Sequence, residues 1–226
     1  DMEKEYLICT AKDGVASYLP IDTAIMEKSG DSYTLALTGK TVTFTVGAVK
    51  PIAFDDVKPT DWFAESVAWA LQKGITVGTS ETTFSPNATC TRAQIITFLW
   101  RAVGSPAAKS AEMHFTDVPA KAYYRDAVLW AVENGIVKGT SEAKFTPDGI
   151  CTRAEIVTLL WRLMQSPAAS GANPFADVAA DAYYAQAVLW AVERNITVGT
   201  SKAAFSPNAV CTRAAIVTFL YRALEK

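Results

Sequence analysis

The chain has 226 residues and a formal net charge of −2. This length allows one or two domains, and because half of the residues are hydrophobic, they can bury a sizeable core. Its balanced charge and lack of a basic run argue against nucleic acid as a partner, and no apolar run approaches the ~20 residues that span a bilayer. The first residues, Asp1 to Glu5, do not resemble a signal peptide. We therefore expect a part of a longer protein, with its targeting segment and further domains elsewhere.

The first 50 residues predict a small β module. Short runs of β-branched and aromatic residues lie between turn signals, and one run alternates Thr with apolar residues. The predicted strands cover residues 6–10, 15–21, 33–37 and 41–46. A stretch this short buries little apolar surface by itself. It is therefore either the tail of a larger domain or a module packed on the residues that follow.

The remainder of the chain consists of three copies of one unit. A Cys-Thr-Arg-Ala motif begins at Cys90, Cys151 and Cys211, at intervals of 61 and 60 residues. Such self-similarity indicates one supersecondary unit built three times around a common core. The repeats are predicted to cover residues 52–109, 113–170 and 173–226, and to form one cooperative domain.

A first helix is predicted in each repeat. Apolar residues follow helical spacing, and then a Gly or an Asn stands where the helix must end, because these residues adopt the left-handed conformation at low cost. The predicted helices cover residues 61–73, 123–134 and 183–194, and their stop residues are Gly74, Gly135 and Asn195. We expect the tryptophans inside these helices to be core residues. The aromatic residues that begin them are either more exposed, as a platform for a sugar, or packed in the core.

A second helix is predicted to begin at each motif. Threonine is a good N-cap, and Gln94 and Glu155 complete capping boxes in the first two repeats. Ala215 occupies this position in the third repeat, so its cap is half built. Arg213, which follows the third cap directly, is therefore expected to be held less firmly than its counterparts.

The motif arginine is the sharpest functional signal in the sequence. A cation in the first helical turn opposes the helix dipole. Its presence in all three repeats indicates an anion or a carboxylate partner at Arg92, Arg153 and Arg213. The arginines near the ends of the second helices, where positive charge is favourable, are interpreted as structural: Arg101, Arg162 and Arg222.

Residues typical of catalysis are scarce. The three motif cysteines are expected to be buried free thiols; three thiolates meeting near a pseudo-threefold axis to hold zinc is the alternative, but it lacks a fourth ligand. The single histidine, His114, lies between repeats, and no nucleophile or nucleotide-binding motif is present. We predict a protein that is not an enzyme and needs no cofactor or metal.

The repeats resemble the S-layer homology (SLH) family. The resemblance lies in a Phe-x-Asp-Val opening, an aromatic pair, a Trp-Ala helix ending in Gly-Ile, a Gly loop, Phe-x-Pro and Thr-Arg-Ala-Glu, here complete at Thr152–Glu155. It implies a mainly α fold: a pseudo-threefold trimer of helix–loop–helix units around a central helix bundle, here preceded by the β module. It also implies an extracellular, wall-bound protein of a Gram-positive-type bacterium that binds a secondary cell-wall polysaccharide, often one with pyruvylated N-acetylmannosamine.

The resemblance and the residue pattern together suggest a ligand site in each groove between neighbouring repeats. The family's main ligand residue maps to the motif arginine, and an exposed aromatic beside it and a Gly-Thr loop would suit a sugar. A recurring Asp completes the set, although it also suits a turn. The candidate residues are Arg92, Arg153, Arg213, Trp62, Tyr123, Tyr183, Asp56, Asp117, Asp177, Gly78, Thr79, Gly139, Thr140, Gly199 and Thr200.

Two features of the sequence depart from the family and leave other functions open. The loop reads Gly-Thr-Ser where many members have Gly-Tyr-x-Asp-Gly, and Ala215 replaces the motif Glu in the third repeat. One alternative is a rigid protein–protein spacer in which the arginines pair internally with Asp or Glu. Another is the anchor of an enzyme whose catalytic domain lies outside this chain.

Overall fold

The computed structural model describes residues 54–225 and, before them, only the backbone of five short strands. The strands pair antiparallel, β1 with β2 and β4 with both β3 and β5. Four of them overlap the predicted strands, whereas β3 was not predicted. The packing of the β module lies outside the described residues and stays a prediction. The strands are β1 Tyr6–Thr10, β2 Ala16–Pro20, β3 Met26–Ser29, β4 Ser32–Leu37 and β5 Lys40–Thr45.

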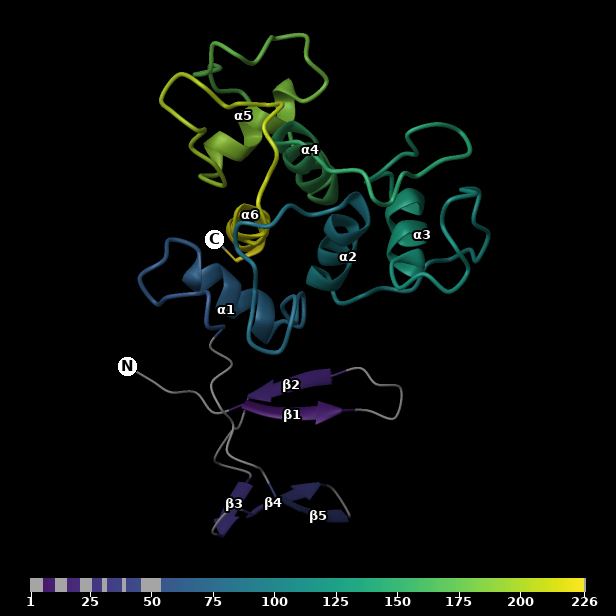
Figure 1. Cartoon of the computed structure of the whole chain (residues 1–226), viewed down its shortest axis with the longest axis vertical. Coiled ribbons are helices and arrows are strands. Elements are labelled where there is room, and N and C mark those ends of the chain that lie inside the picture. Colours follow the sequence, from purple (N-terminus) through teal and green to yellow (C-terminus); the bar gives the residue numbers. More distant parts are fainter. Residues whose placement is uncertain are drawn as a thin grey trace.

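Six helices make up the regular structure of residues 54–225, so this part is mainly α, as predicted (Figure 1). The first helix of each repeat starts two or three residues later than predicted. In the first repeat a turn precedes it, in which the N–H of Ala64 donates to the carbonyl of Asp61 at 3.0 Å. The helices are α1 Ala64–Gln72, α2 Arg92–Ala102, α3 Arg125–Glu133, α4 Arg153–Leu163, α5 Ala185–Glu193 and α6 Arg213–Leu224.

The predicted helix stops and starts are confirmed. Gly74, Gly135 and Asn195 have φ of 67°, 68° and 54°, the left-handed conformation that ends the first helices. Capping boxes begin α2 and α4, whereas α6 has only the bond from the N–H of Ala215 to the side chain of Thr212, at 3.3 Å. Both signals are local, which is why the sequence revealed them.

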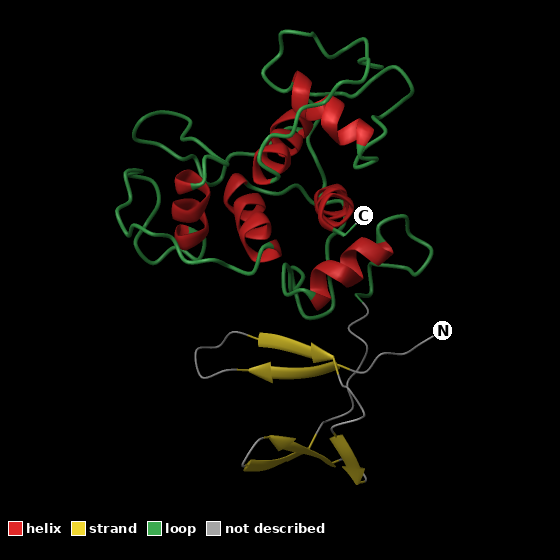
Figure 2. Cartoon of the chain, turned by 180° about the vertical axis from the view of Figure 1, so that it is seen from behind, coloured by secondary structure: helices red, strands yellow, loops and turns green. Residues whose placement is uncertain are grey.

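The helices pack in pairs, and each pair joins two successive repeats. The second helix of one repeat packs on the first helix of the next, α2 on α3 and α4 on α5, and α6 returns to α1. The three second helices also contact one another, and Figure 1 shows them toward the middle with α1, α3 and α5 outside. The repeats are thus closed into a ring with three equivalent junctions, and Figure 2 shows the connecting loops spread around its outside.

One hydrophobic core runs through all three repeats. The phenylalanines of the Phe-x-Pro segments are fully buried, and the tryptophans inside the first helices are core residues, as predicted. None of the helices in the described part has the length and apolar run needed to cross a bilayer. These recurring phenylalanines and tryptophans are Phe84, Phe145, Phe205, Trp69, Trp130 and Trp190.

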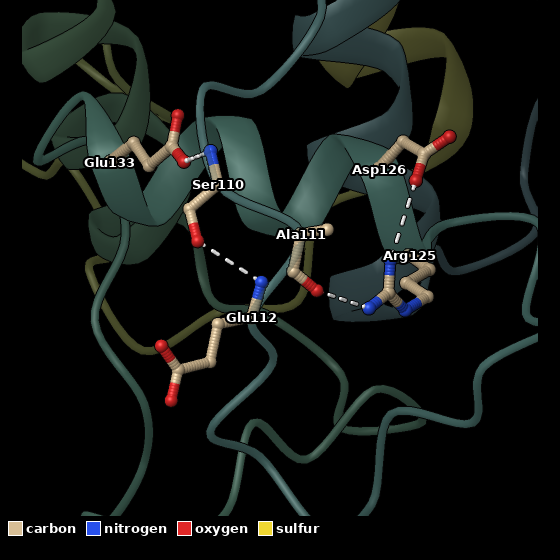
Figure 3. Close-up of polar contacts among 6 residues, drawn as sticks. All are labelled: Ser110, Ala111, Glu112, Arg125, Asp126 and Glu133. Atoms are coloured by element: carbon tan, nitrogen blue, oxygen red, sulfur yellow. Dashed lines mark hydrogen bonds and ion pairs between the residues drawn. The ribbon is translucent and has the colours of Figure 1, made fainter.

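Hydrogen bonds hold the linkers between repeats against the helices that follow them. The N–H of Ser110 donates to the carboxylate of Glu133 at 2.6 Å, and Arg125 Nη2 donates to the carbonyl of Ala111 at 2.6 Å (Figure 3). Glu193 accepts from the backbone of the next linker in the same way. These bonds hold the linkers along α3 and α5 and so help to set the spacing of successive repeats.

Candidate functional site at the repeat junctions

Each second helix begins against a loop of the next repeat. The first N–H groups of a helix have no partner within it. In α2 the N–H groups of Arg92 and Ala93 donate to the carbonyls of Gly149 and Pro147, at 2.7 and 3.0 Å. The other junctions use the same bonds: Arg153 and Ala154 to Ala209 and Pro207, and Arg213 and Ala214 to Ala88 and Pro86.

These contacts correct the expectation that an anion binds at the helix N-terminus. The third N–H of each helix is taken by the threonine cap, and the first two are taken by carbonyls of the next repeat. The positive end of the helix dipole therefore already faces two carbonyl oxygens. The backbone of the motif joins one repeat to the next, so only the arginine side chain is left as a group that could bind a ligand.

Arg213 is the most enclosed of the three motif arginines. Its side chain crosses from the third repeat to the first, where Nε donates to the carbonyl of Phe84 at 2.8 Å and Nη2 to the hydroxyl of Thr76 at 3.2 Å. The guanidinium lies over the rings of Phe84 and Phe98, at 4.8 and 5.4 Å from their centroids. The residue is 4% exposed.

Arg153 makes the same contacts between the second and third repeats. Its Nε donates to the carbonyl of Phe205 at 3.0 Å and its Nη2 to the hydroxyl of Thr197 at 3.3 Å. The rings of Phe205 and Phe219 lie 4.9 and 5.4 Å from the guanidinium. Planar guanidinium groups are well suited to such combined hydrogen bonding and stacking.

Arg92 is the exception. Val137 and Leu159 stand where the other junctions have threonine and the second phenylalanine, so Arg92 has neither the hydroxyl nor the second ring. Its Nη2 donates to the carbonyl of Lys138 at 2.6 Å, and the ring of Phe145 lies 5.0 Å away. Its Nε is buried and, among the described residues, has no hydrogen-bond partner.

The expectation that Arg213 is the loosely held arginine is therefore wrong. The bond that Ala215 cannot make would have reached only the Thr212 backbone, whereas the guanidinium is fixed by the next repeat. The interpretation that these arginines pair with Asp or Glu is also wrong for residues 54–225, where none of the three has a carboxylate at ion-pair distance. Carbonyl oxygens, ring faces and, at two junctions, a hydroxyl surround the charge instead.

The motif cysteines are buried free thiols, as predicted. Burial raises the pKa of Cys90 to about 11, against the opposing effect of the Arg213 guanidinium beside it; the pKa values of Cys151 and Cys211 rise to about 11 for the same main reason. The thiols therefore stay protonated at neutral pH. Within the described residues no three Cys, His, Asp or Glu side chains gather to hold a metal ion.

The recurring aspartates hold the Phe-x-Pro loops. Asp56 accepts hydrogen bonds from the N–H groups of Phe84 and Ser85, at 2.8 and 2.7 Å, and Asp117 and Asp177 bind the equivalent groups. The bond from the N–H of Phe205 is the main cause that lowers the pKa of Asp177. This geometry places the aspartates in the turn role that the sequence offered as an alternative to ligand binding.

The Gly-Thr loops fold back on the same segments. At Gly78 φ is 88°, and a Cβ there would lie 2.6 Å from Phe54 Cε1 and from the Thr83 carbonyl oxygen. The hydroxyl of Thr79 lies 2.7 Å from that of Ser85. The equivalent loop residues Gly139, Thr140, Gly199 and Thr200 make the corresponding contacts. Close packing of the loop accounts for the glycine without any ligand.

The aromatic residues before the first helices are the exposed members of the candidate set. Trp62, Tyr123 and Tyr183 are 64%, 60% and 64% exposed. Burial and then the charge of Glu155 raise the pKa of Tyr183, and Cys151, which lies beside Arg92, also contributes. Glu155 belongs to α4, on which α5 packs, so this ring shortly before α5 belongs to the junction between the second and third repeats.

Sequence reasoning missed the groups that surround the arginines. The Phe-x-Pro segment was recognised, but its phenylalanine carbonyl and ring, and the buried threonines Thr76 and Thr197, were not connected with the motif. The available signals were the changes from Thr to Val at Val137 and from Phe to Leu at Leu159, which mark the junction that differs.

Three helical repeats closed through equivalent junctions, each crossed by an arginine, define the class of protein: a domain of helical repeats with a shared core. The model of the S-layer homology domain matches residues 53–96, 114–157 and 174–216, and the chain belongs to this family.

The curated relatives include bacterial surface proteins. The chain is 28% identical over 194 residues to the surface-layer 125 kDa protein of Lysinibacillus sphaericus, which covers 82% of this chain and 16% of that protein. It is 26% identical over 199 residues to the S-layer protein sap of Bacillus anthracis, covering 84% and 24%. An endoglucanase of Bacillus sp. (strain KSM-635) is 35% identical over 109 residues, covering 48% and 11%. The chain thus spans a quarter or less of these relatives.

Proposed function

We propose that this chain is a non-catalytic module that anchors a larger protein to the bacterial cell wall, at the cell surface. The support is its membership of the S-layer homology family and its similarity to surface-layer proteins. The ligand is a secondary cell-wall polysaccharide that carries negative charge, such as a pyruvylated one. The repeats, over residues 52–109, 113–170 and 173–226, are arranged about a pseudo-threefold axis with a groove at each junction.

The groove of Arg92 is the principal ligand site in this proposal. The observation that carries it is the buried Nε of Arg92, which has no partner in the described part of the chain. A buried donor left unsatisfied costs about 1–3 kcal/mol, and a shift of the Arg92 side chain that brings this donor to an anionic oxygen would remove this cost. Arg153 and Arg213 have their Nε bonded to the protein and mainly hold the ring together.

The remaining candidates act around this cation. Tyr123, shortly before the helix that packs on α2, offers an exposed ring to a sugar near the same junction, with Tyr183 and Trp62 in the equivalent positions of the other two. The aspartates and the Gly-Thr loops keep the Phe-x-Pro segments in the shape that each arginine requires. Their contribution to binding is therefore indirect.

Sedimentation with purified cell-wall sacculi tests the proposal. The chain is expected to sediment with intact sacculi and to stay in solution when the polysaccharide has been stripped. Arg92→Gln should weaken binding about tenfold or more, because it removes a charge-assisted contact. Arg125→Gln is the matched control, because that arginine also donates to a backbone carbonyl but holds a linker. Equal binding to intact and stripped sacculi would exclude wall-polysaccharide anchoring.

Two alternatives have specific support. The enclosed arginines Arg153 and Arg213 fit a rigid spacer between protein partners, and this function predicts no response to stripping of the sacculi. The similarity to an endoglucanase fits the anchor of an enzyme, since the match covers 11% of that protein. The anchor of an enzyme would still bind the wall, so this alternative changes the cargo and not the activity of the chain.

A further inference from the structure

The junction between the third and first repeats contains a carboxylate held by two donors. Glu225, directly after α6, accepts a hydrogen bond from the indole Nε1 of Trp69 at 3.0 Å and lies 3.3 Å from Lys73 Nζ. The bond from Trp69, followed by that from Lys73, lowers the pKa of Glu225. This corner of the fold therefore forms a carboxylate site, filled here by the chain itself.

The same corner recurs between the second and third repeats without a carboxylate. Trp190 and Arg194 are the counterparts of Trp69 and Lys73 in the repeat. They line a cavity of about 180 Å³ together with Arg222 and the apolar side chains of Met164, Pro167 and Ala223.

The hydrogen-bond donors that line this cavity have few acceptors within the described part of the protein. Among the described residues, the Trp190 indole donates to no acceptor and neither arginine has an ion-pair partner. Arg222 donates from Nη1 to the carbonyl of Ile196 at 3.1 Å, which leaves other guanidinium donors for a ligand. The neighbouring carboxylate of Glu193 is occupied by the linker backbone.

We propose that this cavity binds a compact organic carboxylate. Guanidinium groups match carboxylate geometry with paired N–H donors, and the indole N–H repeats the contact that Trp69 makes with Glu225. At ~30 Å³ for each water molecule, the cavity has room for about six heavy atoms. This size suits a three-carbon acid such as pyruvate, free or attached to a sugar. The proposal concerns a site separate from the Arg92 groove and does not rest on wall binding.

The remaining junction provides an internal comparison. Between the first and second repeats, Asn134 replaces the cation at position 194, and its Nδ2 donates to the carbonyl of Trp130 at 2.8 Å. Leu163 stands where the cavity has Ala223, so the space is partly filled by a larger side chain. We therefore expect no carboxylate binding at Trp130.

Indole N–H signals in nitrogen-15 NMR spectra of the full chain test the proposal, with Trp190→Phe used to assign the Trp190 signal. Sodium pyruvate, at ionic strength matched by sodium chloride, should shift the Trp190 signal saturably and leave those of Trp69 and Trp130 in place. Methyl pyruvate, which has no charge, should have no effect. A pyruvylated saccharide alongside free pyruvate distinguishes the two sources of the carboxylate.

Two variants make the test specific. Arg194→Asn copies the equivalent residue of the second repeat and should weaken pyruvate binding about tenfold; because Arg194 is exposed, the melting temperature should hardly change. Glu225→Ala frees the donors of Trp69 and Lys73 and should make the Trp69 signal respond as well. The proposal is overturned if neither carboxylate shifts Trp190, if Arg194→Asn binds as well as the parent, or if Trp130 responds equally. Each of these results would leave the sacculus experiment unaffected.

Discussion

Replacing Arg213 by alanine should open the ring at the junction where its last repeat meets its first. The substitution removes two hydrogen bonds, to the carbonyl of Phe84 and the hydroxyl of Thr76, and the contacts with the rings of Phe84 and Phe98. A buried carbonyl left without its donor costs about 1–3 kcal/mol, and the lost cation–π contacts about 1–2 kcal/mol.

Part of this loss is offset, because alanine removes a cation whose burial is itself unfavourable. We expect a net decrease of about 2–4 kcal/mol in the free energy of unfolding. For a domain of this size 1 kcal/mol corresponds to about 2–4 °C in melting temperature. Arg213→Ala should therefore melt about 5–15 °C below the parent chain, as measured by circular dichroism.

Arg92→Ala is the matched control for this experiment. Arg92 occupies the same position of the motif, but it makes one hydrogen bond and one ring contact, and its Nε is unpaired. Its removal should cost only about 1 kcal/mol, close to the value of a single hydrogen bond. If Arg92→Ala lowered the melting temperature as much as Arg213→Ala, the assignment of different roles to the two arginines would be refuted.

Three further outcomes are expected. Deleting residues 173–226 removes α6, the partner of α1, so the remaining repeats should unfold; a two-repeat fragment that melts cooperatively near the parent temperature contradicts this. Thiol reagents should label Cys90, Cys151 and Cys211 slowly until denaturant is added. Because folding raises the pKa of these thiols, their contribution to the free energy of unfolding should be complete below pH 9 and should be lost as the pH rises toward about 11. Gly78→Ala should destabilise the first repeat by about 1–3 kcal/mol, because φ is positive and the new Cβ meets Phe54 and Thr83; unchanged chemical denaturation would contradict the close packing of this loop.

The sequence by itself determined the local features of this protein. The spacing of the Cys-Thr-Arg-Ala motifs revealed three repeats, and the residues at helix ends predicted where helices stop and start. Gly74 and Asn195 ended their helices, and Gln94 and Glu155 completed their capping boxes, because these interactions connect residues only a few positions apart. The burial of Trp69 also followed from its place inside the predicted helix, whereas the exposure of Trp62, two residues before α1, was left open.

The tertiary structure alone decided what each arginine meets. The motif lies a few residues after a Phe-x-Pro segment in the chain, yet Arg153 contacts that segment in the next repeat, at Phe205, and Arg213 reaches back 129 positions to Phe84. Local propensity does not encode such partners, because a helix can bury the same apolar face against its own repeat or a neighbour's. The ring closes through neighbouring repeats because each second helix packs on the first helix of the following repeat, and this packing turns the expected anion site at the helix start into a link between repeats.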